Sequence, residues 1–324
     1  MIRFSTIGTN FITEKFLEEA FKCDNLKYTA VYSRSKSKAS TFAEKYGVER
    51  YYTDLNQMAA ADDIDAVYIA SPNSLHCEQA ILMMEHGKHV LCEKPIASNW
   101  NELNHMQHTA REKGVVLLEA MKSVFDPGFQ AMKDNLCKLG KIRRVSFQYC
   151  QYSSRYDKFK RGIIENAFNL QYSNGALMDI GVYCVHPLIK LFGMPETVKA
   201  DALLLENGID GAGTILAGYS EMQAELTYSK ITNGRIPSQI QGENAVMIVS
   251  DIYYIKELEI CYNDGHNDKI SIQKENIMLY EIQEWLRLIN TGSSTEEYNC
   301  SSELEMKLTD EARRQVGLIF PADE

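Results

Sequence analysis

The stretch 65–95, DAVYIASPNSLHCEQAILMMEHGKHVLCEKP, constrains the fold of this chain more than any other. It begins with the apolar run AVYIA, which lacks the alternation of a half-exposed strand and is typical of a parallel strand covered on both faces. The turn residues SPNS end that strand. Apolar residues then recur at i, i+3, i+4 and i+7 between Cys77 and Met84, which predicts a helix that ends at Gly87. The run VLC predicts the next strand.

Two polar turns follow the two strands of this stretch. A strand, a helix and a second strand in this order form a right-handed parallel unit, so both strands end at the same edge of the sheet. Open parallel sheets bind ligands at that edge, where Ser71-Pro72-Asn73 and Glu93-Lys94-Pro95 fall. A solvated surface position is the ordinary alternative for a lysine. The placement of Lys94 nevertheless predicts a role in a ligand site.

The motifs SPNSLH and GKHVLCEKP resemble those of the glucose-fructose oxidoreductase and inositol dehydrogenase family (Gfo/Idh/MocA), and weaker similarity continues over most of the chain. The resemblance implies a pyridine-nucleotide oxidoreductase in which Lys94 lies beside both the nicotinamide and the substrate. In such an enzyme this edge of the sheet holds the nicotinamide end of the cofactor. The residues expected to contact the cofactor there are Ser71, Pro72, Asn73, His76, Glu93 and Lys94.

The composition is that of an ordinary soluble protein. The chain has 324 residues, 45% of them hydrophobic, which suffices for two domains with buried cores. A net charge of -10 argues against nucleic-acid binding and favours a small-molecule partner. The eight cysteines form no C-x-x-C pair, so we expect reduced thiols and a cytoplasmic location. The sequence begins directly with an apolar strand and contains no apolar run of membrane-spanning length, so we expect neither secretion nor membrane insertion.

The strand predicted at 2–7 leads into GTNFIT and then a helix. This is the position of the glycine-rich dinucleotide turn, where backbone N–H groups and a helix N-terminus bind the pyrophosphate. Only Gly8 fits the pattern G-x-G-x-x-G, because Asn10 and Thr13 replace the other glycines. Since Asn tolerates a left-handed backbone, we expect Asn10 to make the turn; a plain strand-to-helix loop is the alternative. The predicted cofactor contacts are Gly8, Thr9, Asn10, Phe11 and Ile12.

The residues that follow the second strand, at 28–32, indicate which cofactor is bound. An acid at this place accepts a hydrogen bond from the ribose 2′-hydroxyl of NAD, whereas a basic residue accommodates a 2′-phosphate. The sequence here is SRSKSK, without an acid. We therefore expect NADP(H) to be preferred and NAD(H) to be possible, with Ser33, Arg34 and Lys38 as contacts and Arg34 able to stack on the adenine. A solvated basic loop before a helix at 39–46 is the alternative.

Long strands dominate the second half of the chain. They are predicted at 198–206, 214–227 and 245–252 without crossover helices between them, which is typical of a mostly antiparallel sheet. We therefore expect an α/β chain with two domains. The first, at 1–122, is a Rossmann domain with a doubly wound parallel sheet. The second, at 123–324, is an α+β domain with a large, mostly antiparallel open sheet, which binds the substrate and mediates oligomerisation.

The run GALMDIGVYCVHP, at 175–187, predicts a helix with a polar face. Asp179, Tyr183 and His186 are spaced i, i+4 and i+7, so all three project from one side. The alternative is a buried tyrosine bonded to the acid, with His186 as a satisfied core histidine. The run resembles the family's G-x-L-x-D-x-G-x-[HY] helix, which faces the nicotinamide, and its tyrosine is similar to that of the glucose-fructose oxidoreductase and dihydrodiol dehydrogenase branch. His186 departs from the Asp or Asn often found there. We expect Lys94, Asp179, Tyr183 and His186 to bind the substrate, and a loop at 152–174 to control specificity.

The expected reaction is hydride transfer between nicotinamide C4 and a carbon that bears a hydroxyl or carbonyl group, in a sugar, cyclitol or related diol. Tyr183 is the expected proton donor, since the ammonium of Lys94 would favour its phenolate and hydrogen-bond the substrate oxygen. The alternative within this mechanism is Lys94 as donor with Tyr183 orienting the substrate. Asp179 would bind substrate hydroxyls or hold Lys94 in place.

Two further expectations concern metals and the competing class of protein. Hydride transfer from this cofactor needs no metal, and His105 and His108 lack further ligands at zinc-site spacing. A non-catalytic sensor that binds the dinucleotide is the competing class. The set of Lys94, Asp179 and Tyr183 favours an enzyme, because a sensor needs no proton donor. The resemblance also implies a homodimer or homotetramer.

Overall fold

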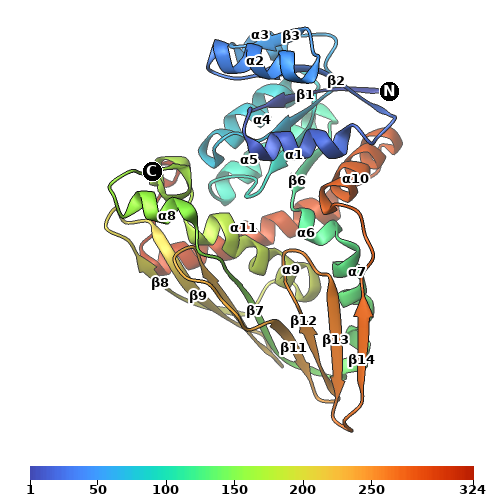
Figure 1. Cartoon of the computed structure of the whole chain (residues 1–324), viewed down its shortest axis with the longest axis vertical. Helices are drawn as coiled ribbons and strands as arrows, with labels where there is room; N and C mark the ends of the chain where they lie inside the picture. The colour runs from blue at the N-terminus through green and yellow to red at the C-terminus, as the bar shows by residue number, and fades with distance from the viewer. The chain divides into compact units, whose positions relative to one another are not determined.

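The computed structural model describes residues 1–324 and divides the chain into two compact units (Figure 1). The first unit contains Met1–Ala120 and Met278–Glu303, and the second contains Met121–Ile277 and Leu304–Glu324. A late segment of the chain therefore belongs to the same unit as the N-terminal strands. The long helix α11 (Glu296–Val316) contributes its beginning to the first unit and its remainder to the second.

The first unit is built on a six-stranded parallel sheet with the strand order β3-β2-β1-β4-β5-β6. This order, with the first strand in the middle, is that of a doubly wound Rossmann sheet and confirms the predicted fold class. The strands are β1 (Ile2–Ile7), β2 (Leu26–Tyr32), β3 (Arg50–Tyr52), β4 (Ala66–Ile69), β5 (His89–Glu93) and β6 (Leu117–Ala120). The helices are α1 (Phe11–Ala20), α2 (Lys36–Tyr46), α3 (Leu55–Ala59), α4 (His76–Glu85), α5 (Trp100–Lys113) and α10 (Ile277–Thr291).

Local capping explains where these helices begin. Asp54 accepts a hydrogen bond from the Asn56 N–H at the start of α3, and Asn99 does the same for Glu102 at the start of α5. Ser35 caps α2 by accepting from the N–H of Lys38, so this helix begins at Lys36, earlier than the predicted residue 39. The basic segment, residues 33–38, consequently consists of a loop up to Ser35 and the first turn of α2 from Lys36.

The second unit contains an eight-stranded sheet with the order β14-β13-β12-β11-β7-β10-β9-β8. Neighbouring strands are antiparallel except for β7 and β10, which are parallel, so the prediction of a mostly antiparallel sheet is confirmed. The strands are β7 (Ile142–Cys150), β8 (Thr197–Leu204), β9 (Asp210–Gly218), β10 (Gln223–Ser229), β11 (Ser238–Gly242), β12 (Ala245–Val249), β13 (Glu257–Tyr262) and β14 (Asn267–Ser271). The single strand predicted at 214–227 is wrong, because a tight turn in which the Tyr219 N–H donates to the Met222 carbonyl separates β9 from β10.

Helices cover one face of this sheet and leave the other face open. Buried side chains of α7 (Pro127–Asp134), α9 (Val182–Phe192) and α11 pack on one side of the strands in a single hydrophobic core. On β8 the exposed residues alternate with half-buried ones, as expected for a sheet with one solvated face. The short helix α6 (Lys122–Phe125) precedes α7.

Two helical segments differ from their predictions. The loop expected at 152–174 contains the short helix α8 (Ser154–Phe159) and two 3-10 turns, and its Phe168 packs into a small buried cluster with Ile209. The helix expected at 175–187 begins as a π-helical turn, Leu177–Gly181, which continues into α9. Segments of π-helix are uncommon and occur frequently at functional sites.

By length and composition alone, the apolar segment Leu170–Phe192 could cross a membrane. The expectation that the chain has no apolar run of membrane-spanning length is therefore wrong. However, 78% of its most apolar window is buried inside the protein. This burial is what the core helix of a globular unit shows, since α9 supplies much of the hydrophobic core on the second sheet.

Candidate active site

The turn after β1 is made by Gly8 and Asn10. Gly8 has φ +116, and a Cβ there would lie 2.8 Å from the Ala70 carbonyl oxygen, so the position requires glycine. Asn10 has φ -92 and ψ 177, so the expectation of a left-handed Asn10 is wrong. Its side chain instead accepts from the N–H groups of Ile12 and Thr13, at 3.0 and 3.2 Å, and donates to the Ala70 carbonyl at 2.8 Å. Asn10 therefore fixes the start of α1 against the end of β4 without the missing glycines.

The basic segment lies at the carboxyl end of β2, where Arg34 and Lys38 are exposed. The backbone of Ser33 is anchored to β3, since its N–H donates to the Tyr52 carbonyl at 3.1 Å. Lys36 and Lys38 occupy the first turn of α2, whose N-terminal N–H groups also attract anions. The predicted phosphate contacts are thus presented on an anchored loop and a helix start.

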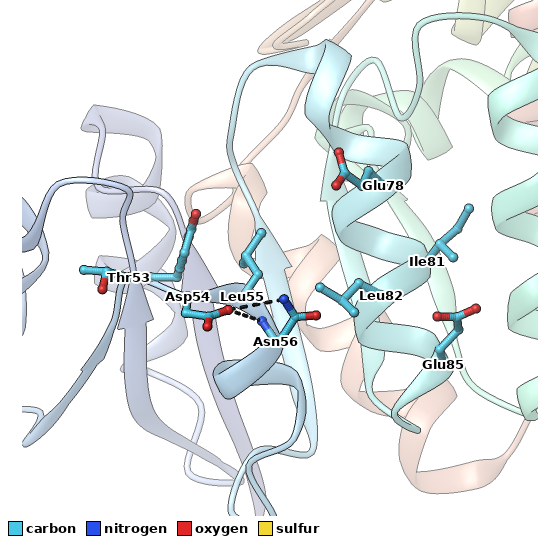
Figure 2. Close-up of a pocket in the computed structure, with 9 residues that line it drawn as sticks. Thr53, Asp54, Leu55, Asn56, Glu78, Ile81, Leu82 and Glu85 are labelled. Atoms are coloured by element: carbon cyan, nitrogen blue, oxygen red, sulfur yellow. Dashed lines mark hydrogen bonds between the residues drawn. The ribbon is translucent and has the colours of Figure 1, made fainter.

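A pocket of about 660 Å³ lies beside this segment, at the ends of β2 and β3 and along α4 (Figure 2). The pKa of its residue Tyr32 is raised, mainly by burial, while Arg34 lowers it and Asp54 and Glu78 raise it. These three charged side chains therefore all act on the Tyr32 hydroxyl. Sequence reasoning missed this pocket, since only the position of its strands in the sheet brings together Tyr32, Thr53, Asp54, Leu55, Asn56, Glu78, Ile81, Leu82 and Glu85.

The two polar turns after β4 and β5 lie at the same edge of the sheet, because the strands are parallel neighbours with Ile69 opposite Cys92. His76 joins the turns. Its ring is fully buried, with Nδ1 3.0 Å from the Pro95 carbonyl oxygen and Nε2 2.9 Å from that of Ser71. Burial lowers the pKa of His76 to about 4, with Lys94 acting in the same direction, so the imidazole is neutral at neutral pH. His76 thus ties the turn after β4 to the turn after β5, which contains Lys94.

Glu93 is oriented from inside the sheet. The hydroxyl of the fully buried Tyr68 donates to Glu93 Oε1 at 2.5 Å. Burial, together with the Glu93 carboxylate, raises the pKa of Tyr68 well above its usual value, so the phenol remains a donor. Nearby, the Ser71 hydroxyl donates to Gln79 Oε1 at 2.7 Å, and Asn73 is almost buried. Buried side chains of the first unit therefore hold Glu93 and Ser71, two of the predicted nicotinamide contacts.

In the second unit, Asp179 forms an ion pair with Lys230. Lys230 directly follows β10, and its side chain is only 4% exposed, whereas that of Asp179 is 28% exposed. The Lys230 ammonium also lies over the Phe168 ring, 5.6 Å from its centroid. Sequence reasoning missed Lys230, because a single lysine after a strand is usually solvated.

Tyr183 is almost buried and lies against two other tyrosines. The rings of Tyr149 and Tyr253 stack on each other, with centroids 4.6 Å apart and an interplanar angle of 4°. Tyr183 meets both edge-on, at centroid distances of 5.8 and 6.1 Å. The predicted proton donor therefore has a defined ring orientation that nothing in its own segment of sequence indicated.

His186 is buried and its Nδ1 lies 2.5 Å from Oε2 of Glu305, which is also buried. This geometry matches the alternative of a paired core histidine. Along the helix, Asp179, Tyr183 and His186 thus contact Lys230, a tyrosine pair and Glu305 respectively. The structure shows distinct surroundings for the three residues that the i, i+4, i+7 spacing grouped together.

Comparisons with known proteins agree with this description. The sequence profile of the oxidoreductase family with an NAD-binding Rossmann fold, GFO/IDH/MocA, matches residues 2–121, and that of the GFO/IDH/MocA C-terminal domain matches residues 134–248. The chain is 48% identical to scyllo-inositol 2-dehydrogenase (NADP(+)) IolU of Bacillus subtilis, over 100% of both chains. It is 27% identical to trans-1,2-dihydrobenzene-1,2-diol dehydrogenase of Mus musculus, over 100% of this chain and 99% of that one.

Among solved structures, the chain resembles KijD10, a 3-ketoreductase from Actinomadura kijaniata in complex with NADP and TDP-benzene. The TM-score is 0.87 at 21% identity, and the match covers 97% of this chain and 98% of that one. At this identity the likeness establishes a shared fold.

Proposed function

Because the chain belongs to the GFO/IDH/MocA oxidoreductase family, we propose that it transfers a hydride between NADP(H) and a carbinol or carbonyl carbon of a cyclitol or sugar. The observation that carries the proposal is the 48% identity, over the full length of both chains, to an NADP-dependent scyllo-inositol dehydrogenase. The basic segment after β2, which has no acid for a ribose 2′-hydroxyl, independently supports the preference for the phosphorylated cofactor.

The residues of the first unit fit this cofactor, whose nicotinamide donates or accepts the hydride. In the turn of Gly8, Thr9, Asn10, Phe11 and Ile12, the backbone N–H groups of Thr9, Asn10 and Phe11 would hold the pyrophosphate. The N–H groups of Gly8 and Ile12 shape the turn, because they donate to the Tyr32 carbonyl and to Asn10 Oδ1. Ser33, Arg34 and Lys38 would bind the 2′-phosphate, and the pocket beside Tyr32 would take the adenine. Ser71, Pro72, Asn73, Glu93 and Lys94 would hold the nicotinamide end. His76 supports this last group by fixing the backbone on both sides of the edge.

Three side chains act on the substrate in this proposal. Tyr183 gives a proton to the substrate oxygen during reduction and removes it during oxidation, while Lys94 hydrogen-bonds the same oxygen. Lys94 as the proton donor, with Tyr183 orienting the substrate, is the alternative assignment. Asp179 accepts a hydrogen bond from a substrate hydroxyl, a role that its ion pair with Lys230 supports, since this contact fixes the position of a side chain that is still 28% exposed.

Kinetics of Lys94→Ala test the catalytic assignment. Loss of acid-base assistance is expected to lower kcat for scyllo-inositol oxidation by about two to four powers of ten. Lys113→Ala, at the exposed end of α5, is the matched control and is expected to retain full turnover. Near-normal turnover in Lys94→Ala would remove Lys94 from the mechanism.

Nicotinamide fluorescence tests the cofactor. Titration with NADPH and NADH side by side is expected to show tighter NADPH binding, and Arg34→Ala should weaken NADPH by roughly 10- to 100-fold, the value of one charge-assisted hydrogen bond. Arg111→Ala, on the exposed side of α5, is the control. Equal affinity of Arg34→Ala and the unaltered protein for NADPH would refute the phosphate site, and failure to bind either cofactor would refute the proposed function.

We further propose a cytoplasmic homodimer or homotetramer. The open face of the second sheet supports an oligomer, because Leu203 and Leu216 are 55% and 52% exposed on neighbouring strands there. All eight cysteines are free thiols, which supports a reducing location. Light scattering of the purified protein is expected to give twice or four times the 36.9 kDa chain mass, and a monomer would contradict the proposal.

A further inference from the structure

Asp210 is a buried carboxylate that the proposed mechanism does not use. It is the first residue of β9 and is 1% exposed. Its Oδ2 accepts a hydrogen bond from the N–H of Leu177 at 2.7 Å. Leu177 is the first residue of the π-helical turn that continues into α9. A carboxylate from a distant part of the chain therefore caps the helical segment that carries Asp179 and Tyr183.

The chain makes room for this carboxylate at Gly175. Gly175 has φ +128, and a Cβ there would overlap Asp210 Oδ1. The Gly175 carbonyl accepts a hydrogen bond from the N–H of Asp179 at 3.1 Å, so the first helical turn runs from Gly175 to Asp179. The contact between Asp210 and Leu177 lies inside this turn. The position of the Asp179 backbone is consequently set within one turn of the Asp210 carboxylate.

The same end of β9 also holds the charge partner of Asp179. Gly211 directly follows Asp210, and its carbonyl accepts a hydrogen bond from the N–H of Lys230 at 2.9 Å. Lys230 forms the ion pair with Asp179. Two consecutive residues of β9 therefore hold both members of this pair. Asp210 does so through its side chain and Gly211 through its backbone.

Groups from three elements act on the charge of Asp210. The N–H groups of Leu177 and Ala176 at the helix start favour the carboxylate, and so does the Arg313 guanidinium of α11. The Tyr228 phenol of β10 is the third group, since its pKa is raised by burial and then by the Asp210 carboxylate. Burial outweighs the favourable groups and raises the pKa of Asp210 to about 6. Asp210 is therefore mostly charged at pH 7.5 and takes up a proton as the pH falls through about 6.

We propose that Asp210 is a positioning residue for hydride transfer, whose carboxylate holds the segment of Asp179 and Tyr183 in the place where these side chains act on the substrate. This inference rests on the proposed function and deepens it. A charged acceptor forms a stronger hydrogen bond than a neutral one. Because the helix-start N–H groups favour the charge, the charge in turn favours the position in which those groups point at it. Loss of the charge loosens the first turn while Asp210 stays buried.

The pH dependence of kcat/KM tests the inference. The reaction is the reduction by NADPH of the ketone formed from scyllo-inositol, because its proton donor stays protonated in mildly acidic solution. In the unaltered enzyme kcat/KM is expected to fall about tenfold as the pH drops through about 6, the ratio expected when a hydrogen bond to a charged group is exchanged for one to a neutral group. Asp210→Asn keeps the size and an acceptor oxygen but not the charge. It is expected to show the lower kcat/KM already at pH 7.5 and no fall near pH 6.

Asp251→Asn is the matched control. Burial raises the pKa of Asp251 to about 6 as well, but this carboxylate accepts from the N–H of Tyr253 and not from the helical segment. The control is therefore expected to keep the fall near pH 6. A fall that disappears in Asp251→Asn and persists in Asp210→Asn would overturn the inference.

Stability and cofactor binding distinguish positioning from a merely structural role. The raised pKa of Asp210 means that its ionised form costs stability in the folded protein, so Asp210→Asn should melt no lower than the unaltered protein at pH 7.5. The Kd for NADPH should also be unchanged, since the proposed cofactor contacts lie in the first unit. A lower kcat/KM with both values kept would support the inference. A lower melting temperature together with weaker NADPH binding would mean general damage and overturn it.

Nuclear magnetic resonance of the unaltered protein separates this inference from the proposed function and does not depend on the variant folding. In protein labelled with ¹⁵N-leucine, the amide resonance of Leu177 is expected to shift with pH with a midpoint of about 6. This titration without any turnover of the ketone would support the hold of Asp210 on the segment and overturn the proposed function. Turnover with the same pH profile in Asp210→Asn and the unaltered enzyme would overturn the inference and leave the proposed function standing.

Discussion

Replacing Lys230 by methionine is expected to damage the proposed site through Asp179. Methionine keeps most of the length and apolar bulk of the buried lysine chain but removes its ammonium. Lys230 is only 4% exposed, whereas 28% of the Asp179 side chain reaches solvent. Asp179 therefore loses its charge partner while retaining some contact with water.

The magnitude follows from this difference in burial. Leaving one member of a fully buried ion pair without its partner costs about 3–5 kcal/mol, and a hydrogen bond to a charged group contributes about 1.5–3 kcal/mol. Because water can partly replace the ammonium at Asp179, we expect the smaller cost, about 2 kcal/mol in the free energy of unfolding. The loosened carboxylate should also lower kcat/KM for a polyol by roughly 10- to 100-fold. The loss expected here is that of the hydrogen bond between Asp179 and a substrate hydroxyl, since a bond to a charged group contributes about 1.5–3 kcal/mol and about 1.4 kcal/mol corresponds to tenfold.

A double-mutant cycle of Lys230→Met and Asp179→Asn is the decisive assay. Urea denaturation and steady-state kinetics are measured for both single variants and the double variant. If Lys230 acts through Asp179, the double variant loses little more than Asp179→Asn alone, with a coupling of about 1.5–3 kcal/mol. Lys199→Met, on the exposed side of β8, controls for loss of a charge. Losses that add to within about 0.5 kcal/mol would refute the reasoning.

Three further predictions concern stability and the cofactor turn. The pKa of His76 is about 4 in the folded protein and about 6.5 in the unfolded chain, so the unfolded chain takes up the proton first as the pH falls. The free energy of unfolding should therefore fall by about 3 kcal/mol as the pH drops from 6.5 to 4. An equal loss of stability in urea titrations of His76→Gln over the same pH range would contradict this prediction. Lys274→Met leaves the buried carboxylate of Asp126, which is 1% exposed, without its charge partner. Urea denaturation should show a loss of about 3–5 kcal/mol in the free energy of unfolding. Adding Asp126→Asn should recover part of this loss. Gly8→Ala should abolish tight NADPH binding, because its Cβ would lie 2.8 Å from the Ala70 carbonyl oxygen. Gly47→Ala is the control and should bind NADPH normally, since Gly47 has a left-handed backbone but open space around it. Comparable NADPH affinities in the two variants would disprove the steric argument.

Much of the fold was predictable because its signals are local. The uninterrupted apolar runs of the first half predicted a parallel sheet, and the order of strands confirms it. The long strands of the second half predicted an antiparallel sheet, which is also confirmed. The motifs around Lys94 indicated the oxidoreductase family, and the profile matches over both halves confirm that prediction. Errors arose where a short turn or cap moved a boundary, as at Ser35 and between β9 and β10.

The sequence alone determined the family, the two kinds of sheet and the strand edge on which Lys94 stands, since apolar periodicity, turn residues and short motifs are properties of neighbouring residues. The tertiary structure decided how the candidate side chains are held. The partner of Asp179 lies 51 positions away, the rings against Tyr183 come from β7 and from the connection between β12 and β13, and Asn10 replaces a glycine by bonding the end of β4. Periodicity shows which face of an element is buried but not which distant strand end meets that face, because that choice depends on the packing of the whole unit.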